Sequence, residues 1–485
     1  MRVSDAFTLT AAVVLAIDLT TVGAATARSE EAPGGDGVDP PASEQDFTAD
    51  VLTTGLSDPF EITSGPDGFI WTTERTAGRV TRIDPSSGEK STVLTIHRVV
   101  ATPGQQDGLL GMALHPDLFR GHANPYVYLS YTYDDNRDPG VLDRRQRIVQ
   151  YNYDAQSGSL SSPRELISGL PASGDHNSGR LKFGPDGKLY YSIGDQGNNQ
   201  YRNTCRPIES QRLPTREEVD VGDWTAYQGK ILRLNPDGSI PDDNPTFGGV
   251  RSHILTYGHR NVQGLVFGPD NRLYASEHGP KTDDELNLVR SGGNYGWPQV
   301  VGYRDDSAYV YGNWSALPEC DPADYDDIEI PPEVPRAPEH DFHDPAFVSP
   351  LRTFFTVPSD YDFTGEACEP SQEFFICYPT VAPSSLDFYT GDAIPGWHGS
   401  FLMPSLKHGT LYRLPLLDGD GTAVDGGIPL FTTVNRYRDT EMSPDGRIIY
   451  VATDSAGMAR GEDGAPTPDL ENPGSILRFR YTAGG

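Results

Sequence analysis

Two arginines separated by one tyrosine, Arg436-Tyr437-Arg438, have the spacing that points most directly to chemistry. Residues i and i+2 of a β-strand lie on the same face, so both guanidinium groups can point the same way. The chain carries 38 basic and 69 acidic residues, a net charge of −31. Paired cations in so acidic a chain indicate a site for a small, multiply charged anion held bidentately. Lys407 is a second candidate for the same pocket.

A second candidate centre is the segment Asp175-His176, with Asp195 and Gln200 following about one strand later. A carboxylate that bonds one imidazole nitrogen fixes the tautomer and leaves the other nitrogen free to act as a base. We therefore predict that Asp195 orients His176 and that Asp175 contacts the substrate. A purely structural histidine is the alternative interpretation.

Carboxylates and Gly/Pro turns are dense between residues 277 and 306, where Gly279-Pro280 is followed by Asp283-Asp284-Glu285 and Asp305-Asp306. Carboxylates and exposed backbone carbonyls suit a hard cation such as Ca²⁺. The segment contains no strict Asp-x-Asp-x-Asp loop, so a solvated acidic loop stays open as an alternative.

Several common catalytic motifs are missing from the sequence. It contains no His-Glu-x-x-His, no Gly-x-x-x-x-Gly-Lys-[Ser/Thr] and no Gly-x-Ser-x-Gly motif. The βαβ pattern that nicotinamide binding needs is also missing. Oxidation chemistry in this chain would need another organic cofactor.

The elements that must position these residues are indicated by a recurrent turn of the Pro-Asp-Gly type. In such a turn Pro presets φ, Asp bonds the backbone nearby and Gly accepts positive φ. A β-prone run follows each turn, which predicts a hairpin. The six turns lie at residues 65–68, 115–117, 184–187, 268–271, 383–385 and 443–446.

Six hairpin units predict an all-β, six-bladed β-propeller with extended rim loops over residues 46–485. A strand at 476–479 is expected to complete a blade begun by N-terminal residues and so close the ring. A β-sandwich with recurrent Pro-Asp turns is the alternative fold. The 52 Gly, 41 Pro and 10% aromatic residues favour β-structure over helical bundles.

Composition also limits the partners. The acidic balance argues against nucleic acid and anionic membranes, and no segment after the N-terminus approaches the ~20 apolar residues of a membrane span. Residues 1–27 have the pattern of a signal peptide and 28–45 that of a flexible leader. We therefore expect a periplasmic or secreted protein.

Export would permit the four cysteines to form disulfides. Cys368 and Cys377 bracket a short loop and are the first candidate pair. Cys205 and Cys320 are the second, although the sequence does not fix the pairing.

The ordered blocks together resemble the soluble quinoprotein glucose dehydrogenases, six-bladed propellers that carry pyrroloquinoline quinone (PQQ) and Ca²⁺. The similarity covers nearly the whole mature chain. Its blocks are 108–111, 175–176, 193–197, 258–261, 292–298, 379–385, 404–407 and 435–439.

The resemblance implies roles for individual residues. Those matching the family's cofactor contacts are Lys407, Arg436 and Arg438 as clamps, with Thr380 and Asn261 as hydrogen-bonding positions. Those matching metal positions are the carbonyls of Gly279 and Pro280 for a catalytic Ca²⁺, and Glu285, Tyr295, Val301, Tyr303, Asp305 and, across a gap, Glu339 for a structural Ca²⁺ region. Those matching sugar contacts are Gln106, Asp175 and Gln200.

The resemblance also implies a mechanism and a partner set. His176 would take the proton of the anomeric hydroxyl of an aldose, and the anomeric hydride would pass to the quinone. Ca²⁺ would act as a Lewis acid and Arg260 would stabilise the developing negative charge. The sugar would leave as a lactone, and an external acceptor would take the electrons. Members of the family suggest a homodimer.

Three positions depart from the best-known family members: His278 stands in place of Gln, Phe375 in place of Tyr and Tyr378 in place of Trp. These positions border the cofactor and sugar sites, so we expect an altered sugar preference. Two other functions stay open. One is a calcium-dependent propeller hydrolase of the lactonase kind, with its metal on the central axis and no quinone; the other is a binding propeller without catalysis.

Overall fold

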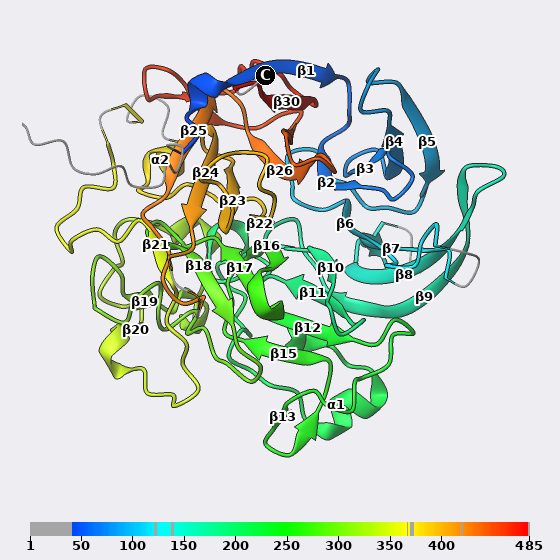
Figure 1. The fold of residues 1–485 in the computed structure, drawn as a ribbon. Coiled ribbons are helices and arrows are strands. Elements are labelled where there is room, and N and C mark those ends of the chain that lie inside the picture. Colours follow the sequence, from blue (N-terminus) through cyan, green and yellow to red (C-terminus); the bar gives the residue numbers. More distant parts are fainter. Residues whose placement is uncertain are drawn as a thin grey trace, which may run out of the picture. The chain divides into compact units, whose positions relative to one another are not determined.

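The strands of the computed structural model form six four-stranded antiparallel sheets arranged around a ring (Figure 1). The structure describes residues 41–120, 124–136, 140–365, 367–368, 373–417, 419 and 421–483. The predicted six-bladed β-propeller is thus confirmed. The expected signal peptide, 1–27, lies outside the described residues, as does the expected leader up to residue 40.

Blades one to six are numbered in chain order. They consist of β2 (Pro59–Ser64), β3 (Ile70–Glu74), β4 (Arg79–Ile83) and β5 (Lys90–Thr95); β6 (Leu109–Leu114), β7 (Tyr126–Asp134), β8 (Arg144–Asp154) and β9 (Ser159–Pro171); β10 (Leu181–Phe183), β11 (Leu189–Ile193), β12 (Lys230–Leu234) and β15 (Ile254–Tyr257); β16 (Val262–Phe267), β17 (Leu273–Glu277), β18 (Asp284–Val289) and β21 (Arg352–Phe354); β22 (Asp387–Tyr389), β23 (Ser400–Ser405), β24 (Gly409–Pro415) and β25 (Ile428–Thr433); and β26 (Tyr437–Met442), β27 (Ile448–Thr453), β30 (Ile476–Tyr481) and β1 (Phe47–Thr53).

The other elements are short and lie in the connections between strands. Three two-residue hairpins pair β13 (Thr246–Phe247) with β14 (Val250–Arg251), β19 (Tyr311–Gly312) with β20 (Arg336–Ala337), and β28 (Ala459–Arg460) with β29 (Pro466–Thr467). The helices are α1 (Arg216–Val221), α2 (Phe374–Cys377) and the 3₁₀ turns η1 (Glu44–Asp46), η2 (Tyr201–Asn203), η3 (Thr225–Tyr227), η4 (Pro269–Asn271), η5 (Trp314–Ala316), η6 (Pro322–Asp324) and η7 (Glu339–Asp341). Within the described ranges, no helix is long and apolar enough to cross a membrane.

Five of the six predicted turns connect the first and second strands of a blade. Their aspartates act as the turn chemistry requires: Asp186 accepts the Lys188 N–H at 3.1 Å and Asp445 accepts the Arg447 N–H at 3.1 Å. The expected turn at 383–385 is wrong. It precedes β22 rather than following it, and the β22–β23 connection is residues 390–399, which lack the Pro-Asp-Gly signature.

The ring is closed by strands from both ends of the described chain. Strand β1 pairs antiparallel with β30, with Phe47 opposite Tyr481, and β30 pairs with β27. Figure 1 shows blue β1 beside red β30. This is the closure that the sequence predicts. Just before β1, the Ala42 N–H donates to the Pro395 carbonyl at 2.8 Å.

The cores lie between neighbouring blades. Trp71 of blade one packs edge-on against Tyr153 of blade two, with ring centroids 5.4 Å apart, and both lie in one buried cluster. A second cluster joins Tyr128 of blade two to Leu181 and Leu232 of blade three. Inward-facing aromatic and aliphatic side chains of consecutive sheets therefore supply the contacts that hold the blades together.

Arg180 lies at the centre of the ring. Its fully buried guanidinium donates to Glu61 of β2 at 2.6 Å, to Asp439 of β26 at 3.1 Å, and to the carbonyls of Gln263 and Ser384, each at 2.9 Å. These partners come from four other blades. A single side chain thus ties the inner strands of five blades to one another.

The inner hairpins also determine where functional side chains can meet. The first and second strands of each blade are antiparallel, so residues before a first strand and after a second strand lie at the same end of the ring. This end, which we call the site end, carries the residues before β2, β6, β10, β16, β22 and β26 and those after β3, β7, β11, β17, β23 and β27. The candidates His176, Asp195, Arg260, Lys407 and Arg436 all occupy such positions.

A buried histidine in blade three makes the fold sensitive to acid. His253 Nδ1 lies 3.1 Å from the Tyr227 hydroxyl and Nε2 lies 3.1 Å from the Gly238 carbonyl oxygen. Burial lowers the pKa of His253 from 6.5 to about 4. As pH falls below 6.5, the unfolded chain takes up this proton before the folded chain does, so stability falls until pH 4. The full loss for this group is about 3 kcal/mol.

Chemical unfolding between pH 7 and pH 4 measures this effect. We expect the His253→Gln variant to show a smaller pH-dependent loss of unfolding free energy than the wild type. The matched control is His398→Gln, a change at a histidine whose side chain is 65% exposed, and it should leave the slope unchanged. Equal slopes for wild type and His253→Gln would contradict the assignment.

Candidate active site

His176 is held in the geometry of a general base. Its Nδ1 lies 2.7 Å from Asp195 Oδ1, while Nε2 lies 3.5 Å from the Gln200 amide nitrogen. His176 is 6% exposed and Asp195 is fully buried. Asp195 also accepts from the indole N–H of Trp297 at 2.9 Å and from the Gly197 N–H at 2.8 Å. The structure brings the predicted pair together and adds Trp297, which sequence reasoning did not single out.

The backbone around this pair is strained. His176 and Ser178 have φ of 42° and 54°, and Gln196, Asn199 and Tyr201 have φ of 69°, 62° and 45°. Positive φ is costly for residues other than glycine and concentrates at functional sites. These two loops, before β10 and after β11, are therefore held in place by the surrounding structure rather than by local preference.

Arg260 lies beside His176 and is fixed from several directions. Its Nη2 donates to the Gln200 side-chain oxygen at 3.1 Å, and its guanidinium carbon lies 5.3 Å from the centre of the Trp297 ring. The Arg260 N–H donates to Glu277, whose other oxygen lies 2.8 Å from His259 Nδ1. Glu277 and His259 therefore position the backbone that carries Arg260.

Two buried donors at this point have no protein partner. Arg260 Nε and Asn261 Nδ2 are buried and make no hydrogen bond with any described residue. A buried donor without a partner costs free energy unless a ligand satisfies it. Both residues match cofactor-contacting positions of the family that the sequence resembles, so the structure provides donors where a cofactor's oxygens are expected.

The three expected sugar contacts lie together at one cavity. Gln106 donates to Asp175, and Gln200 Nε2 lies 3.4 Å from the other oxygen of Asp175. A cavity of 1020 Å³ is lined by these three residues and by Phe375, whose side chain is 41% exposed. Asp175 Oδ1 is 3.8 Å from His176 Nε2, so this cavity adjoins the candidate base.

Arg436 and Arg438 converge, as the sequence predicts, and one carboxylate holds both. Asp454, directly after β27, accepts from Arg436 Nε at 3.0 Å and from Arg438 Nε and Nη2 at 2.7 Å each. Burial alone would raise the pKa of Asp454, but Arg438 and Arg436 outweigh it and hold the pKa at about 2. Asp454 therefore stays ionised and fixes the direction of both guanidinium groups.

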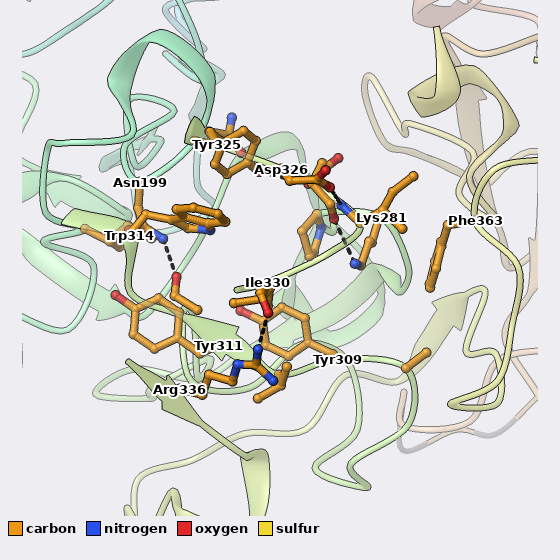
Figure 2. Close-up of a pocket in the computed structure, with 18 of the residues that line it drawn as sticks. Asn199, Lys281, Tyr309, Tyr311, Trp314, Tyr325, Asp326, Ile330, Arg336 and Phe363 are labelled. Atoms are coloured by element: carbon orange, nitrogen blue, oxygen red, sulfur yellow. Dashed lines mark hydrogen bonds between the residues drawn. The ribbon is translucent and has the colours of Figure 1, made fainter. Parts of the chain in front are cut away.

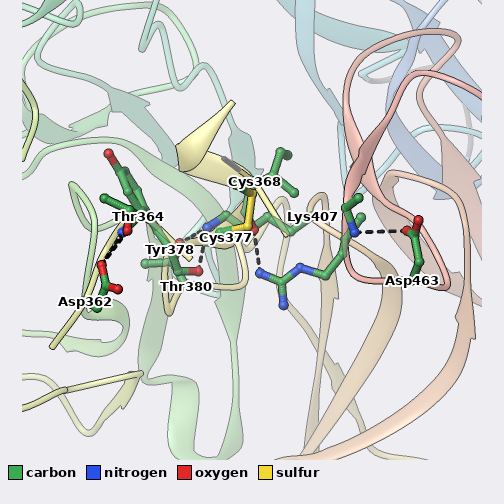
Figure 3. Close-up of a disulfide and its surroundings, with 11 residues drawn as sticks. Asp362, Thr364, Cys368, Cys377, Tyr378, Thr380, Lys407 and Asp463 are labelled. Carbon is green, nitrogen blue, oxygen red and sulfur yellow. Dashed lines mark hydrogen bonds between the residues drawn. A yellow bond between two sulfur atoms is a disulfide. The ribbon is translucent and has the colours of Figure 1, made fainter. Parts of the chain in front are cut away.

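Lys407 belongs with Arg436 and Arg438 to a group of basic side chains that we call the basic region. Its Nζ donates to the Tyr378 carbonyl at 2.9 Å and to the Thr380 hydroxyl. Figure 3 shows these residues beside the Cys368–Cys377 disulfide, which constrains the loop that carries Tyr378. Burial lowers the pKa of Lys407, an effect that Asp284 opposes.

The basic region carries more positive than negative charge. Arg460 is close enough to lower the pKa of Lys407 further, and its backbone N–H donates to the Lys407 carbonyl at 2.6 Å. Four basic side chains, Lys407, Arg436, Arg438 and Arg460, thus stand against the carboxylates of Asp284 and Asp454. This local excess in a chain of net charge −31 suits a ligand with several carboxylates.

Residues 278–280 connect the basic region to the candidate base. The His278 carbonyl lies 3.5 Å from Arg260 Nη1, and its ring Nε2 lies 2.9 Å from the Pro383 carbonyl oxygen. Burial lowers the pKa of His278 well below its usual value, with further lowering by Arg260, His176 and Arg438. The His278 imidazole is therefore close enough to interact electrostatically with Arg260 and His176 on one side and with Arg438 of the basic region on the other.

The carbonyl oxygens of Gly279 and Pro280 accept no hydrogen bond from another described residue. They are expected ligands of a catalytic calcium ion. The Gly279 N–H is bonded to Asp284 Oδ1 at 2.8 Å, while Asp284 Oδ2 accepts from the N–H groups of Val381 and Ala382 at 2.7 and 2.6 Å. Asp284 thus joins the expected calcium loop to the loop that carries Thr380.

Replacing Asp284 by Asn tests this link. The amide keeps one acceptor but points an NH₂ group at buried N–H donors, so we expect about 2 kcal/mol less unfolding free energy. We also expect roughly tenfold weaker cofactor binding, because about 1.4 kcal/mol of positioning is lost. Thermal unfolding and equilibrium titration with PQQ measure the two effects.

The adjacent Asp283→Asn variant is the matched control. Asp283 accepts from the hydroxyls of Thr282 and Thr356, which can rotate and accept from an amide instead. Its cofactor affinity should stay near that of the wild type. If the Asp284→Asn variant bound PQQ as tightly as the wild type does, the Asp284 carboxylate would not be what positions the two loops.

The expected structural calcium region is partly assembled. Glu339 accepts the Val301 N–H at 2.9 Å and the Asp305 N–H at 3.1 Å, and Glu285 accepts the Gly302 N–H at 2.7 Å. Burial raises the pKa of Glu285 well above its usual value and that of Glu339 to about 7. Both carboxylates therefore border the loop 301–305, where a cation would offset their burial.

The remaining expected ligands in this region are Tyr295 and Tyr303. The Tyr295 hydroxyl donates to the Leu288 carbonyl at 2.7 Å, and that of Tyr303 lies 3.4 Å from the Leu351 carbonyl oxygen. Their hydroxyls are thus used elsewhere, and a metal contact would fall to their backbone carbonyls. The described residues contain no group of three or more His, Cys, Asp or Glu side chains placed to hold a metal ion, so backbone oxygens would supply most ligands at either calcium site.

Sequence reasoning missed Asp454 and Trp297 as site residues, and it considered Asp284 only as a carboxylate of a possible calcium segment. Asp454 follows β27 as Asp195 follows β11, so its position in the repeat was the available signal. Asp284 and Trp297 act through long-range contacts that carry no such signal. Both candidate disulfides are confirmed as Cys205–Cys320 and Cys368–Cys377.

Comparison with known proteins gives consistent matches. The family model described as glucose / sorbosone dehydrogenase matches residues 56–322 and 363–460. Quinoprotein glucose dehydrogenase B of Acinetobacter calcoaceticus is 44% identical over 91% of this chain and 92% of its own length. Aldose sugar dehydrogenase YliI of Escherichia coli is 29% identical over 72% and 75%. The PQQ-bound aldose sugar dehydrogenase of Streptomyces coelicolor has a TM-score of 0.58 and 25% identity, covering 91% and 99%.

Proposed function

Since this chain belongs to the glucose/sorbosone dehydrogenase family, we propose that it oxidises an aldose such as glucose at the anomeric carbon to the lactone, with PQQ and Ca²⁺. The residues that would carry the reaction are His176, Arg260 and Asp195. Electrons would then pass to an external acceptor. The similarity to quinoprotein relatives supports the cofactor, and the basic region supports its anionic groups.

The observation that carries this proposal is the pair of unpaired buried donors, Arg260 Nε and Asn261 Nδ2, next to an imidazole bonded to a buried carboxylate. A structural histidine would not need empty donors beside it. A non-catalytic binding propeller would not need His176 to be held by Asp195 with its second nitrogen toward a cavity.

The protein's own residues account for the proton and the charge. Asp195 keeps the His176 Nδ1 position protonated, so Nε2 is the free base that takes the proton of the anomeric hydroxyl. Gln106, Asp175 and Gln200 would orient the sugar hydroxyls at the cavity next to Nε2. Arg260, held by Gln200 and Trp297, places positive charge where negative charge develops.

The cofactor would be held by side chains already described. Arg436 and Arg438, fixed by Asp454, and Lys407, fixed by Thr380, would bind its carboxylates. When bound, PQQ supplies the two-electron acceptor and Ca²⁺ the Lewis acid that polarises it. The Gly279 and Pro280 carbonyls would hold that ion, and Glu285 and Glu339, with the carbonyls of Tyr295, Val301, Tyr303 and Asp305, would hold structural calcium.

Two disulfides are compatible with an oxidising compartment, which supports a periplasmic or secreted protein. Phe375 borders the sugar cavity and Tyr378 the Lys407 site, so we propose that these two departures adjust the sugar preference, by roughly 1–3 kcal/mol. A homodimer stays a prediction.

The lactonase-like alternative receives less support. That function would place a metal on the central axis, where Arg180 already donates to Glu61 and Asp439. A guanidinium so placed repels a second cation and uses the carboxylates that would bind it. The alternative also gives no role to the clustered Lys407, Arg436 and Arg438.

Titration of purified protein with PQQ and Ca²⁺, followed by addition of glucose, tests the proposal. We expect saturable cofactor binding and bleaching of the quinone absorbance when the sugar is added. If glucose reduces the bound cofactor poorly, other aldoses should be added in the same way. Binding of PQQ without reduction by any aldose would reject the dehydrogenase function.

A further inference from the structure

A second cavity adjoins the candidate active site and is not used by the sugar chemistry proposed above. It has a volume of 490 Å³ and shares Asn198 and Gln200 with the cavity of the expected sugar contacts. We call it the aromatic pocket, after the seven aromatic residues among its lining, Trp297, Tyr309, Tyr311, Trp314, Tyr325, Tyr361 and Phe363. Figure 2 labels Tyr309, Tyr311, Trp314, Tyr325 and Phe363 among the residues that line it.

The inner wall of the aromatic pocket consists of residues that also contact the candidate active-site residues His176, Asp195 and Arg260. Trp297 donates to Asp195 at 2.9 Å and lies under the Arg260 guanidinium at 5.3 Å. Gln200 bonds Arg260 at 3.1 Å and lies 3.5 Å from His176. Pro280, whose carbonyl is an expected calcium ligand, also lines the pocket. A molecule bound here would lie against the residues that hold the cofactor's reactive end.

The outer wall is held in place before any ligand arrives. Asp327 accepts the hydroxyls of Tyr325 and Tyr378 at 2.8 Å each and that of Tyr201 at 3.2 Å. The Cys205–Cys320 disulfide joins the segment after η2 to the segment that carries Tyr325. Such preorganisation lowers the entropy cost of binding, which is a property of a binding site rather than of a loose surface hollow.

Four polar side chains of the aromatic pocket are already bonded within the protein. The Tyr309 hydroxyl donates to the Pro298 carbonyl at 2.6 Å, and Lys281 Nζ donates to the Asp327 carbonyl at 2.8 Å. The Asn199 amide bonds the Gly312 carbonyl at 2.8 Å, and Arg336 bonds that of Ile330. The seven rings add faces and edges against which a ligand can stack. A planar ring matches those faces better than a sugar, whose hydroxyls need free hydrogen-bonding partners.

The charges around the aromatic pocket disfavour an anion. Lys281 and Arg336 are outnumbered by Asp306, Asp326 and Asp327, and the whole chain carries −31. A negatively charged ligand would be repelled on approach. These charges therefore exclude an anion as the preferred ligand, whereas an uncharged molecule would not be repelled.

We propose that the aromatic pocket binds the electron acceptor of the second half-reaction, an uncharged planar oxidant of the quinone class. This inference rests on the proposed dehydrogenase function. In the step, the cofactor reduced by the sugar gives two electrons and two protons to the bound quinone. The quinone leaves as the hydroquinone, and the cofactor returns to its oxidised form.

Steady-state kinetics of the holoenzyme can separate the two half-reactions. For alternating half-reactions, kcat/KM for glucose reports only sugar oxidation and kcat/KM for the acceptor reports only cofactor reoxidation. The acceptors are p-benzoquinone, which is planar and uncharged, and ferricyanide, which is anionic and has no ring. The quinone is suitable because all four cysteines form disulfides.

The variants are Trp314→Ala and the milder Tyr361→Ala, at a side chain that is 37% exposed. We expect Trp314→Ala to lower kcat/KM for p-benzoquinone about tenfold, the loss of one ring contact. The Tyr361→Ala variant should lower it several-fold. In both variants, kcat/KM for glucose and kcat/KM for ferricyanide should change less than about twofold. Trp314→Phe and Tyr361→Phe keep a ring and are the matched controls, which should retain most of the quinone activity.

Three results would overturn the acceptor site. The first is an equal fall in kcat/KM for p-benzoquinone and for ferricyanide. The second is a selective fall in kcat/KM for maltotriose as the sugar, which would assign the pocket to the substrate. The third is retention of full quinone activity in a folded Tyr361→Ala protein. The proposed function is tested separately by stopped-flow reduction of bound PQQ by glucose with no acceptor present. Failure of that measurement would reject the dehydrogenase itself.

Discussion

The His176→Ala variant is expected to bind PQQ normally and to oxidise glucose roughly 10²–10⁴-fold more slowly than the wild type, the usual loss when a general base is removed. His176 Nε2 lies 3.8 Å from Asp175, which lines the sugar cavity, whereas the cofactor clamps lie just after β23 (Lys407), just before β26 (Arg436) and within β26 (Arg438). Loss of the imidazole therefore removes the proton acceptor without touching the clamps. Single-turnover reduction of bound PQQ measures the chemical step directly.

The controls separate the base from its surroundings. His398→Ala changes an exposed histidine that pairs with Asp392 and should have wild-type turnover. Asp195→Asn keeps the shape of the orienting group but removes the charge that fixes the imidazole, so we expect an intermediate loss of kcat. A His176→Ala protein with normal turnover would require a different base.

The Arg180→Met variant should lose about 3–5 kcal/mol of unfolding free energy, because removing one partner of a buried ion pair leaves the other uncompensated. Asp439 is almost fully buried and would lose its guanidinium partner, whereas the buried Glu61 would keep its bond from Lys182 Nζ at 2.7 Å. The bonds of Arg180 to the Gln263 and Ser384 carbonyls would be lost as well. Denaturant unfolding followed by fluorescence measures the change.

Arg233→Met is the matched comparison for the axial arginine. Arg233 bonds Asp186 and Asp243, but the Asp243 side chain is 70% exposed. Water can solvate that carboxylate after the change, so the loss should be clearly smaller. Equal losses at the two sites would mean that burial at the axis is not what makes Arg180 important. Arg180→Lys should recover only part of the stability, since an ammonium group cannot reach four partners.

The turn chemistry explains how much of the fold could be predicted. Pro-Asp-Gly turns are local, and Asp186 and Asp445 bond backbone only two residues away, so five blades could be found from their sequence alone. Blade five could not be placed correctly because its first turn, 390–399, uses other residues. The Pro383-Ser384-Ser385 segment resembles a turn but places Ser384 at the axis.

The candidate site shows the same division between local and distant contacts. Alternation on a strand predicts that Arg436 and Arg438 point together, yet Arg436 precedes β26 and the register shifts between Tyr437 and Asp439. The two guanidinium groups meet because Asp454 binds both. That partner comes from another strand, and no spacing rule in the segment itself reveals it.

The pairing of β1 with β30 makes the order of the blades in the gene largely arbitrary. Phe47 faces Tyr481 across one sheet, so a few linking residues could join these ends, and new termini could be cut at the exposed tip 86–87 between β4 and β5. Such a circular permutant would keep every strand pair. It would make the β1–β30 pairing a neighbouring one and the β4–β5 pairing the most distant one along the chain, and would leave the candidate active-site residues where they are.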